Sequence, residues 1–282
     1  MPQILGMKFI QMYGGRHLRP VKTIGGREYY STFTDDNSRF TKLYLQRAKD
    51  ETFTSYKTYE ADLLRQKGVH VKKLHSDRGG EYLSKEFSDH LAKSGTKRNL
   101  TVHDTPEHNR VAERLNRTLL EKVRAILHGS GLPKFLWGEA VKHAIWLKNR
   151  SSTKVFEGKT PFEVYEGTKP NLSGLPEFGC KVWVHRPERS KLDGRAVEGR
   201  WVGYDENSSG HRIYSPEKRS VSIQRSVKFS PDEANIYLPR TDTLEGERKR
   251  IEHETSGERP SEIVDPLGDD FDKSIESRPK RA

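Results

Sequence analysis

Cysteine is nearly absent from this 282-residue chain, which contains Cys180 alone. That count excludes a disulfide-stapled scaffold and a zinc site built on several cysteines. We expect Cys180 to be a small buried residue in a reducing compartment. No apolar run approaches the ~18 residues that a membrane-spanning helix needs, and the amino terminus lacks the apolar stretch of a secretory signal. Hydrophobic residues make up only 32% of the chain, so a packed core is expected to use only part of it.

Charge, in contrast, is abundant and unevenly placed. The 51 Lys and Arg residues against 40 Asp and Glu residues give a net charge of +11, which alone is a weak indication of a polyanionic partner. From residue 240 onward, nine basic residues are outnumbered by twelve acidic ones. This stretch has too few apolar residues to offset its ordering entropy, and we predict a disordered tail over 231–282. Its basic clusters at 248–250 and 278–281 are either nuclear-import signals or solvated charge.

Residues 1–152 show the alternating patterns of an α/β domain. The predicted order is β-β-β-α-β-α-β-α-α, which indicates a mixed sheet covered by helices. After an opening strand, strands are expected at 28–33, 39–46, 69–74 and 97–102. Helices are expected from residue 51 to Gly68, at 84–94, from about Asn109 to Gly129 after a loop over 103–109, and at 133–149.

The pattern changes after this domain. Residues 153–177 read as a connection with a short helix starting at Thr160, and 178–230 contain short strand-like runs separated by turn residues. Such runs are typical of a small all-β barrel. Four tryptophans are expected to serve the core rather than to stack on bases: Trp137, Trp146, Trp183 and Trp201.

Two carboxylates have a spacing that suggests chemistry. Asp77 follows a predicted strand, Glu113 lies in the first turn of the long helix, and 35 residues separate them. Carboxylates from a strand end and a facing helix can converge on Mg²⁺, and two such ions can clamp the attacking and leaving oxygens in phosphoryl transfer. The pair is weak evidence by itself, because Glu near a helix start also compensates the helix dipole.

Long motifs carry a resemblance to a known family. The runs at 29–40 (YYSTFTDDNSRF), 74–87 (LHSDRGGEYLSKEF), 101–127 and 132–150 resemble the integrase core of copia-type LTR retrotransposons. The run from Cys180 to Phe229 resembles the small SH3-like barrel that follows that core. The 35-residue gap also fits the DDE pattern of this family.

The resemblance implies an RNase H-like fold with a mixed five-stranded sheet, a following SH3-like barrel, and DNA integration. It implies DNA end processing and strand transfer that depend on Mg²⁺ or Mn²⁺, with Asp77 and Glu113 as two of three metal-binding carboxylates. The implied partners are double-stranded DNA and further copies of the chain, without a membrane, and the implied location is the nucleus or a cytoplasmic element particle.

The sequence departs from the family at two site positions. Gln11 stands where the family has its first Asp, and a neutral amide is a poorer Mg²⁺ ligand than a carboxylate. Arg110 stands where the family has Gly, which permits a flexible loop. Asp35 or Asp36 could replace the missing carboxylate, although Asp in a turn more often bonds its own backbone.

The expected DNA contacts cluster around the two carboxylates. Phosphate or base contacts are expected from the loop after Asp77 and from the face of the long helix that carries Glu113. These residues are Arg78, Asn109, Arg110, Arg114, Asn116, Arg117 and Lys122. The alternative for the helix is an ordinary solvated face.

Three functions remain open from the sequence. The first is an integrase, active or impaired because Gln11 replaces a carboxylate. The second is a non-catalytic DNA-binding protein with the integrase fold, either a remnant of an element or a chain reused by its host. The third is an RNase H-like nuclease unrelated to transposition, which the barrel and the flanking motifs disfavour.

Overall fold

The computed structural model describes most of the first 230 residues. It covers 4–7, 10–11, 21–76, 82, 84–100, 106–185 and 196–230, with the backbone alone at 4–7, 10–11, 100 and 106–113. The predicted tail over 231–282 lies outside the described residues. Among the described helices, none has both the length and the apolar character that crossing a bilayer demands.

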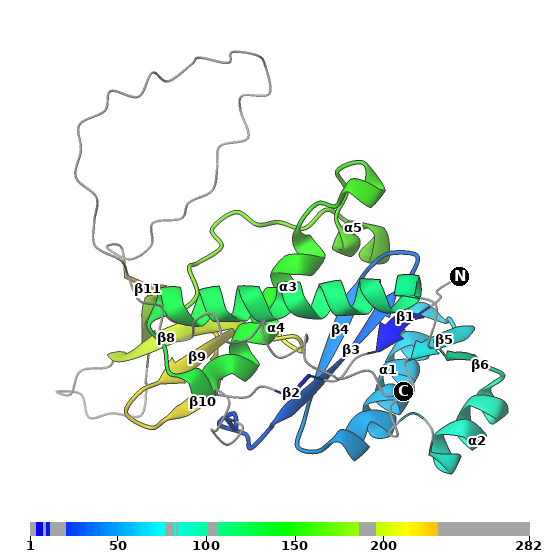
Figure 1. The fold of residues 1–282 in the computed structure, drawn as a ribbon. Helices are drawn as coiled ribbons and strands as arrows, with labels where there is room; N and C mark the ends of the chain where they lie inside the picture. The colour runs from blue at the N-terminus through cyan, green and yellow to red at the C-terminus, as the bar shows by residue number, and fades with distance from the viewer. Residues whose placement is uncertain are drawn as a thin grey trace, which may run out of the picture.

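A mixed sheet forms the first part of the molecule (Figure 1). Its described strands are β1 (Ile4–Met7), β2 (Ile10–Gln11), β3 (Tyr29–Asp35), β4 (Thr41–Gln46), β5 (Lys73–Ser76) and β6 (Lys97–Leu100). Both β1 and β2 pair antiparallel with β3, whereas β5 runs parallel to β1 and to β6. Because β1 and β2 follow one another along the same edge of β3, the described strands occupy five positions, as the sequence predicts.

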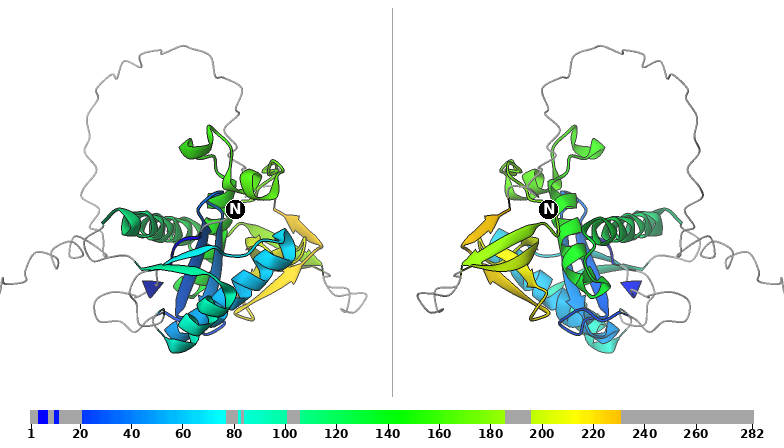
Figure 2. Two further views of the ribbon diagram at one scale, coloured as in Figure 1. Left: turned by 90° about the vertical axis from the view of Figure 1, so that its right-hand side faces the viewer. Right: turned by 90° about the vertical axis from the view of Figure 1, so that its left-hand side faces the viewer.

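Helices cover both faces of this sheet. They are α1 (Thr52–Lys67), α2 (Lys85–Ser94), α3 (Pro106–Ser130), α4 (Trp137–Arg150) and α5 (Pro161–Glu166), with 3₁₀ turns at Lys49–Glu51, Lys134–Leu136 and Lys154–Phe156. Alternate residues of β3 face opposite layers: Tyr30 packs in the cluster with α3 and α4, and Phe33 packs in the cluster with α1 and α2. Figure 2 shows the sheet between the green α3 and the blue-cyan α1.

Several element boundaries differ from the sequence predictions, and two of these differences lie next to the predicted carboxylates. Helix α3 begins at Pro106 rather than near Asn109, so the end of the predicted loop is helical. Proline suits a first helical turn because its missing N–H has no intrahelical partner there. Strand β5 spans 73–76 rather than 69–74, and Val71 is buried without belonging to a strand.

The second part is an antiparallel sheet in the order β10-β9-β8-β7-β11. Its strands are β7 (Lys181–His185), β8 (Ala196–Tyr204), β9 (His211–Ser215), β10 (Ser220–Gln224) and β11 (Val227–Phe229). The two edge strands are joined by residues 225 and 226 alone, which can bridge about 10 Å. A flat sheet would hold its edges about 19 Å apart, so this sheet must curl into the predicted barrel.

The barrel and the α/β part share one apolar core. Val202 of β8 and Tyr214 of β9 lie in the same buried cluster as Leu119 of α3 and Trp137 of α4. Helix α3 runs across the molecule, with its first turns near β1 and its last turns toward the barrel (Figure 1). Helix α4 packs directly on β8. Cys180 is buried at the start of the barrel, as expected.

Candidate functional site

The backbone brings the two predicted carboxylates to one region of the sheet. Strand β5 ends at Ser76, one residue before Asp77, and runs beside β1. Helix α3, which carries Glu113, packs against β1. Asp77 and Arg78 lie outside the described residues, and Asn109, Arg110 and Glu113 are described by backbone alone. Within the described part of the chain, no three His, Cys, Asp or Glu side chains form a metal-binding group.

The register of the opening strands locates Gln11 relative to β5. Met7 pairs with Ser76, the last residue of β5, and Gln11 pairs with Tyr29 of β3. On β3, Leu5 pairs with Thr34 and Gln11 with Tyr29, and these partners are five residues, or about 17 Å, apart along the strand. The level of the β5 end is therefore closer to Met7 than to Gln11. The assignment of Gln11 to the first carboxylate position stays a prediction, and the neighbouring positions become candidates.

Asp35 and Asp36 belong to the β3–β4 turn. The Asp35 carboxylate is buried, and its Oδ2 accepts hydrogen bonds from Ser38 N at 2.8 Å and Ser38 Oγ at 2.5 Å. Asp36 pairs with Arg39 at 2.9 Å. These contacts are those of turn-forming aspartates, which was the expected alternative to a metal-binding role.

Helix α3 has one face toward the protein and another toward solvent. Asn116, Leu119 and Val123 are buried, whereas Arg114 and Arg117 are exposed. Asn116 is only 3% exposed, so the expectation that it lies beside Arg117 on a DNA-facing surface is wrong. A helix turns about 100° per residue, and position 116 falls on the stripe of Leu119 and Val123, three and seven residues ahead.

The exposed arginines of α3 are available for an anionic partner. Arg114, Arg117 and Arg124 are exposed and form no ion pair in the described part of the chain. Glu121 is the acidic side chain described on the same outer face. Lys122 is half-buried at the flank of the helix. Arg124 was not among the predicted DNA contacts, and it extends the face of Arg114 and Arg117 by two turns.

A half-buried lysine, Lys148, lies between α4 and the β3–β4 turn. Lys148 Nζ donates hydrogen bonds to the backbone oxygen of Arg39 and to Thr41 Oγ1, the latter at 2.7 Å. Burial, together with the nearby positive charges of Arg39 and Lys122, lowers the pKa of Lys148 to about 7. The helical pattern of the sequence predicts that Lys148 lies on α4, but it gives no sign of the turn that packs above it.

The barrel is tied to α4 by ion pairs as well as by apolar contacts. Arg212 of β9 donates from Nε and Nη2 to the two carboxylate oxygens of Glu139, at 2.6 and 2.9 Å. Its Nη1 donates to Asp205 Oδ1 at 3.2 Å. A bidentate arginine–carboxylate pair fixes orientation as well as distance, so the barrel has a defined position on α4.

The tryptophans only partly follow the expectation of core packing. Trp137 and Trp201 are fully buried, and Trp146 is half-buried at the edge of a cavity. The expectation that Trp183 packs in the core is wrong, because 39% of this residue is exposed. It alternates with the buried Val182 and Val184 along β7, which puts it on the outer face of the sheet.

Known proteins share sequence similarity with most of this chain. The family described as "Retroviral polymerase SH3-like domain" matches residues 180–243. The chain is similar to the Retrovirus-related Pol polyprotein from transposon TNT 1-94 of Nicotiana tabacum, with 39% identity over 76% of this chain and 16% of that protein. It is also similar to the Transposon Ty1-DR6 Gag-Pol polyprotein of Saccharomyces cerevisiae, with 32% identity over 74% of this chain and 12% of that one. The chain thus spans less than a fifth of these curated relatives.

A solved structure also aligns with part of the chain. It is the HTLV-2 integrase catalytic core domain in complex with magnesium, in its trimeric form. The alignment has 16% identity and covers 56% of this chain and 93% of that one, with a TM-score of 0.40.

Proposed function

Because the chain is a region of the copia/Ty1-type retrotransposon Pol polyproteins, with an integrase core-like part followed by a retroviral SH3-like domain, we propose that it acts in DNA integration. Its homology is to the DDE integrase catalytic core. The proposed reaction is processing of DNA ends and their transfer into target DNA. The observation that supports this most is the backbone arrangement, in which β5 ends just before Asp77 while the helix bearing Glu113 packs on the neighbouring β1.

Asp77 and Glu113 have the chemistry that the reaction requires. Both are hard oxygen donors, and such carboxylates suit Mg²⁺ or Mn²⁺. A bound divalent ion would polarise the phosphodiester and stabilise the charge that develops on its oxygens. Asp77 and Glu113 would hold such an ion, and the exposed Arg114 and Arg117 would bind the DNA backbone beside it. Water or a 3′-hydroxyl is the nucleophile, so no covalent enzyme intermediate forms.

The first carboxylate is the weak point of the proposed site. Two Mg²⁺ ions carry four positive charges, and Asp77 and Glu113 supply only two negative ones. We therefore expect weak strand transfer from the chain as it stands. A second candidate function follows from the arginine face of α3, which needs no metal: DNA binding without catalysis, by a remnant or by a protein reused by its host. In either case the proposed partners are double-stranded DNA and further copies of this chain, and the proposed location is the nucleus.

The catalytic proposal is tested by restoring the missing charge. An aspartate scan over positions 7–11, each variant combined with Arg110→Gly, is assayed for Mg²⁺-dependent joining of a labelled DNA end to a plasmid. We expect one position, Gln11 or a neighbour level with the β5 end, to give product well above that of the parent chain. Adding Asp77→Asn to that variant should abolish the product, because the metal again loses a ligand.

One result would contradict the expected impairment, and another would contradict the catalytic proposal itself. Vigorous joining by the parent chain would show that Gln11 does not impair the site. Failure of every scanned position, in protein that still binds DNA, would favour the non-catalytic function.

The DNA-binding proposal is tested by salt dependence. The logarithm of the DNA association constant falls linearly with log [salt], and each phosphate contact contributes roughly one unit to the steepness of this fall. The double variant Arg114→Ala, Arg117→Ala should therefore make the negative slope shallower by about 2. The measurement is fluorescence anisotropy of a labelled duplex between 50 and 200 mM salt, a range chosen from the usual behaviour of such complexes.

A matched control has the same change of charge on the other side of the sheet. Arg65 of α1 and Lys93 of α2 are exposed, and the variant Arg65→Ala, Lys93→Ala should leave the slope within about 0.5 of the parent value. Equal effects of the two double variants would mean that net charge alone, and not the α3 face, attracts DNA.

A further inference from the structure

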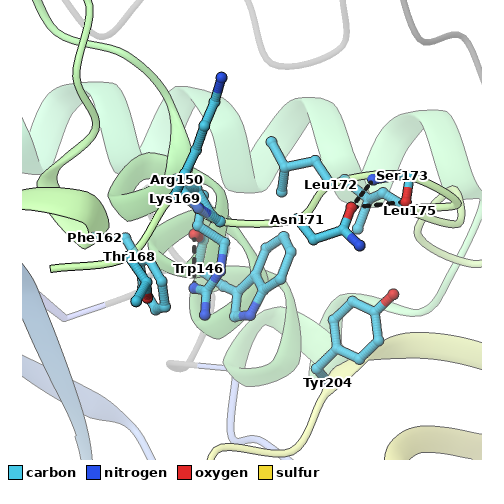
Figure 3. Close-up of a pocket in the computed structure, with 11 residues that line it drawn as sticks. Trp146, Arg150, Phe162, Thr168, Lys169, Asn171, Leu172, Ser173, Leu175 and Tyr204 are labelled. Atoms are coloured by element: carbon cyan, nitrogen blue, oxygen red, sulfur yellow. Dashed lines mark hydrogen bonds between the residues drawn. The ribbon is translucent and has the colours of Figure 1, made fainter. Parts of the chain in front are cut away.

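A cavity lies where the end of α4 meets the connection to the barrel. It has a volume of about 430 Å³ and is bounded by the last turns of α4, by residues 168–175 and by β8 (Figure 3). Its lining includes the rings of Trp146, Phe162 and Tyr204, the cations Arg150 and Lys169, and no carboxylate. This volume is within the range of small-ligand sites, and the lining favours an anionic ligand with a flat ring.

The Arg150 guanidinium is held in place by two aromatic rings and forms no ion pair with the described residues. Its Cζ lies 4.1 Å from the centroid of the Trp146 ring and 4.3 Å from that of Phe162. Its described hydrogen bond runs from Nη1 to the backbone oxygen of Trp146 at 3.4 Å, and in the described part of the chain it has no ion pair.

The electrostatics of Arg150 leave its charge partly uncompensated. Burial lowers the pKa of Arg150 to about 10, against an opposing effect of Glu166. That carboxylate is itself paired with Lys67 at 2.6 Å. Stacking between two rings restricts the guanidinium to one orientation, while most of its five N–H donors stay unused. A preorganised, half-buried cation of this kind is suited to bind phosphate oxygens.

The opposite side of the cavity offers apolar and hydrogen-bonding surface. The Trp146 and Tyr204 rings lie 5.2 Å apart with planes inclined by 31°, and Figure 3 shows Asn171 beside this pair. Asn171 Oδ1 accepts hydrogen bonds from Ser173 N at 2.9 Å and Ser173 Oγ at 2.7 Å. These bonds orient the amide and leave its Nδ2 donors for a ligand. Ring contacts plus an amide donor match the face and edge of a nucleobase.

We propose that this cavity binds a nucleotide, with the phosphate on Arg150 and the base against Trp146, Tyr204 and the Asn171 amide. Lys169 extends from the rim (Figure 3) and adds long-range attraction. The ligand is either a free nucleotide or an unpaired nucleotide of a DNA strand, since both present the same base and phosphate. The site uses neither Asp77 nor Glu113, so its test is separate from that of strand joining.

Calorimetric titration of the full chain with 2′-deoxyadenosine 5′-monophosphate tests the proposal. We expect saturable binding with one site, and Arg150→Met should raise the Kd at least about tenfold by removing the charge. The Kd of Arg150→Lys should lie between those of the parent chain and Arg150→Met, because the lysine ammonium keeps the charge but cannot stack as a planar group. Asn171 lies in an exposed loop. Asn171→Ala should raise the Kd of the nucleotide by about threefold and leave the Kd of inorganic phosphate unchanged.

Lys154→Ala is the matched control, because Lys154 is exposed on the same connection but does not line the cavity; its Kd should stay within about twofold. If a 5′-phosphorylated single strand binds more tightly than the free nucleotide, and a blunt duplex does not compete with it, the ligand is an unpaired nucleotide of a DNA strand. If the free nucleotide binds more tightly than the single strand, the ligand is the free nucleotide. The proposal is overturned if the nucleotide does not bind at millimolar concentration, if phosphate alone binds as tightly, or if folded Arg150→Met binds normally.

Discussion

Trp201→Ala should lower the free energy of unfolding of this chain by about 4 kcal/mol, the usual loss for a large aromatic removed from a core. Trp201 is fully buried, and its ring packs edge-on against His143 at 5.3 Å and Tyr204 at 5.1 Å. Its Nε1 also donates a hydrogen bond to His211 Nδ1 at 3.1 Å. Alanine would leave a cavity between the barrel and α4, and the neighbouring rings could close it only in part.

Urea unfolding followed by far-ultraviolet circular dichroism measures this loss, and the barrel contains its own control. Trp183→Ala makes the same chemical change on the exposed face of β7, 39% exposed, and should cost less than about 1 kcal/mol. Similar losses for the two variants would contradict the burial pattern of the barrel.

Lowering the pH from 7 to 4 should destabilise the protein through His143 by up to about 3 kcal/mol. Burial among Trp146, Trp201 and Phe178 lowers the pKa of His143 to about 4, from 6.5 in the unfolded chain. Between these values the unfolded chain binds the proton and the folded one does not. The stability is therefore complete above about pH 6.5 and is lost as the pH falls toward 4.

The measurement compares unfolding free energies at several pH values for the parent and for His143→Phe, which keeps a ring in the same space. The variant should show a flatter dependence on pH between 4 and 6.5. His128→Asn, on the exposed last turns of α3, should retain the parental dependence. Parallel curves for the parent and His143→Phe would show that other groups cause the acid sensitivity.

Local patterns in the sequence predicted most of the elements. Strands β7, β9 and β11 were recognised because aromatic and β-branched residues cluster in them between turn residues. The ends of α1 and α2 were recognised because Gly68 and Gly95 follow them, and both adopt the left-handed conformation that ends a helix. Such signals act over a few residues and need no knowledge of the fold.

The site was predicted less completely because its geometry depends on distant contacts. Asn116 looked like a surface residue by its chemistry, but the stripe that it shares with Leu119 faces the sheet. Arg150 has no distinguishing pattern in the sequence, and only the fold stacks it between Trp146 and Phe162. The pairing of Met7 with Ser76 is likewise a property of the sheet, which no local pattern of the opening strand determines.

The cluster shared by the barrel and the helices has a consequence for local opening. Val202 of β8 and Tyr214 of β9 are buried in one cluster with Trp137 of α4. If the two barrel residues become exposed to solvent, the buried face of α4 becomes exposed as well. The backbone amides of α4 and β8 should therefore exchange their hydrogens with solvent as one cooperative unit, at a common rate set by a single opening event. A barrel joined to the helices only by a flexible linker would unfold locally without affecting α4. In this chain we expect the barrel and α4 to unfold locally together.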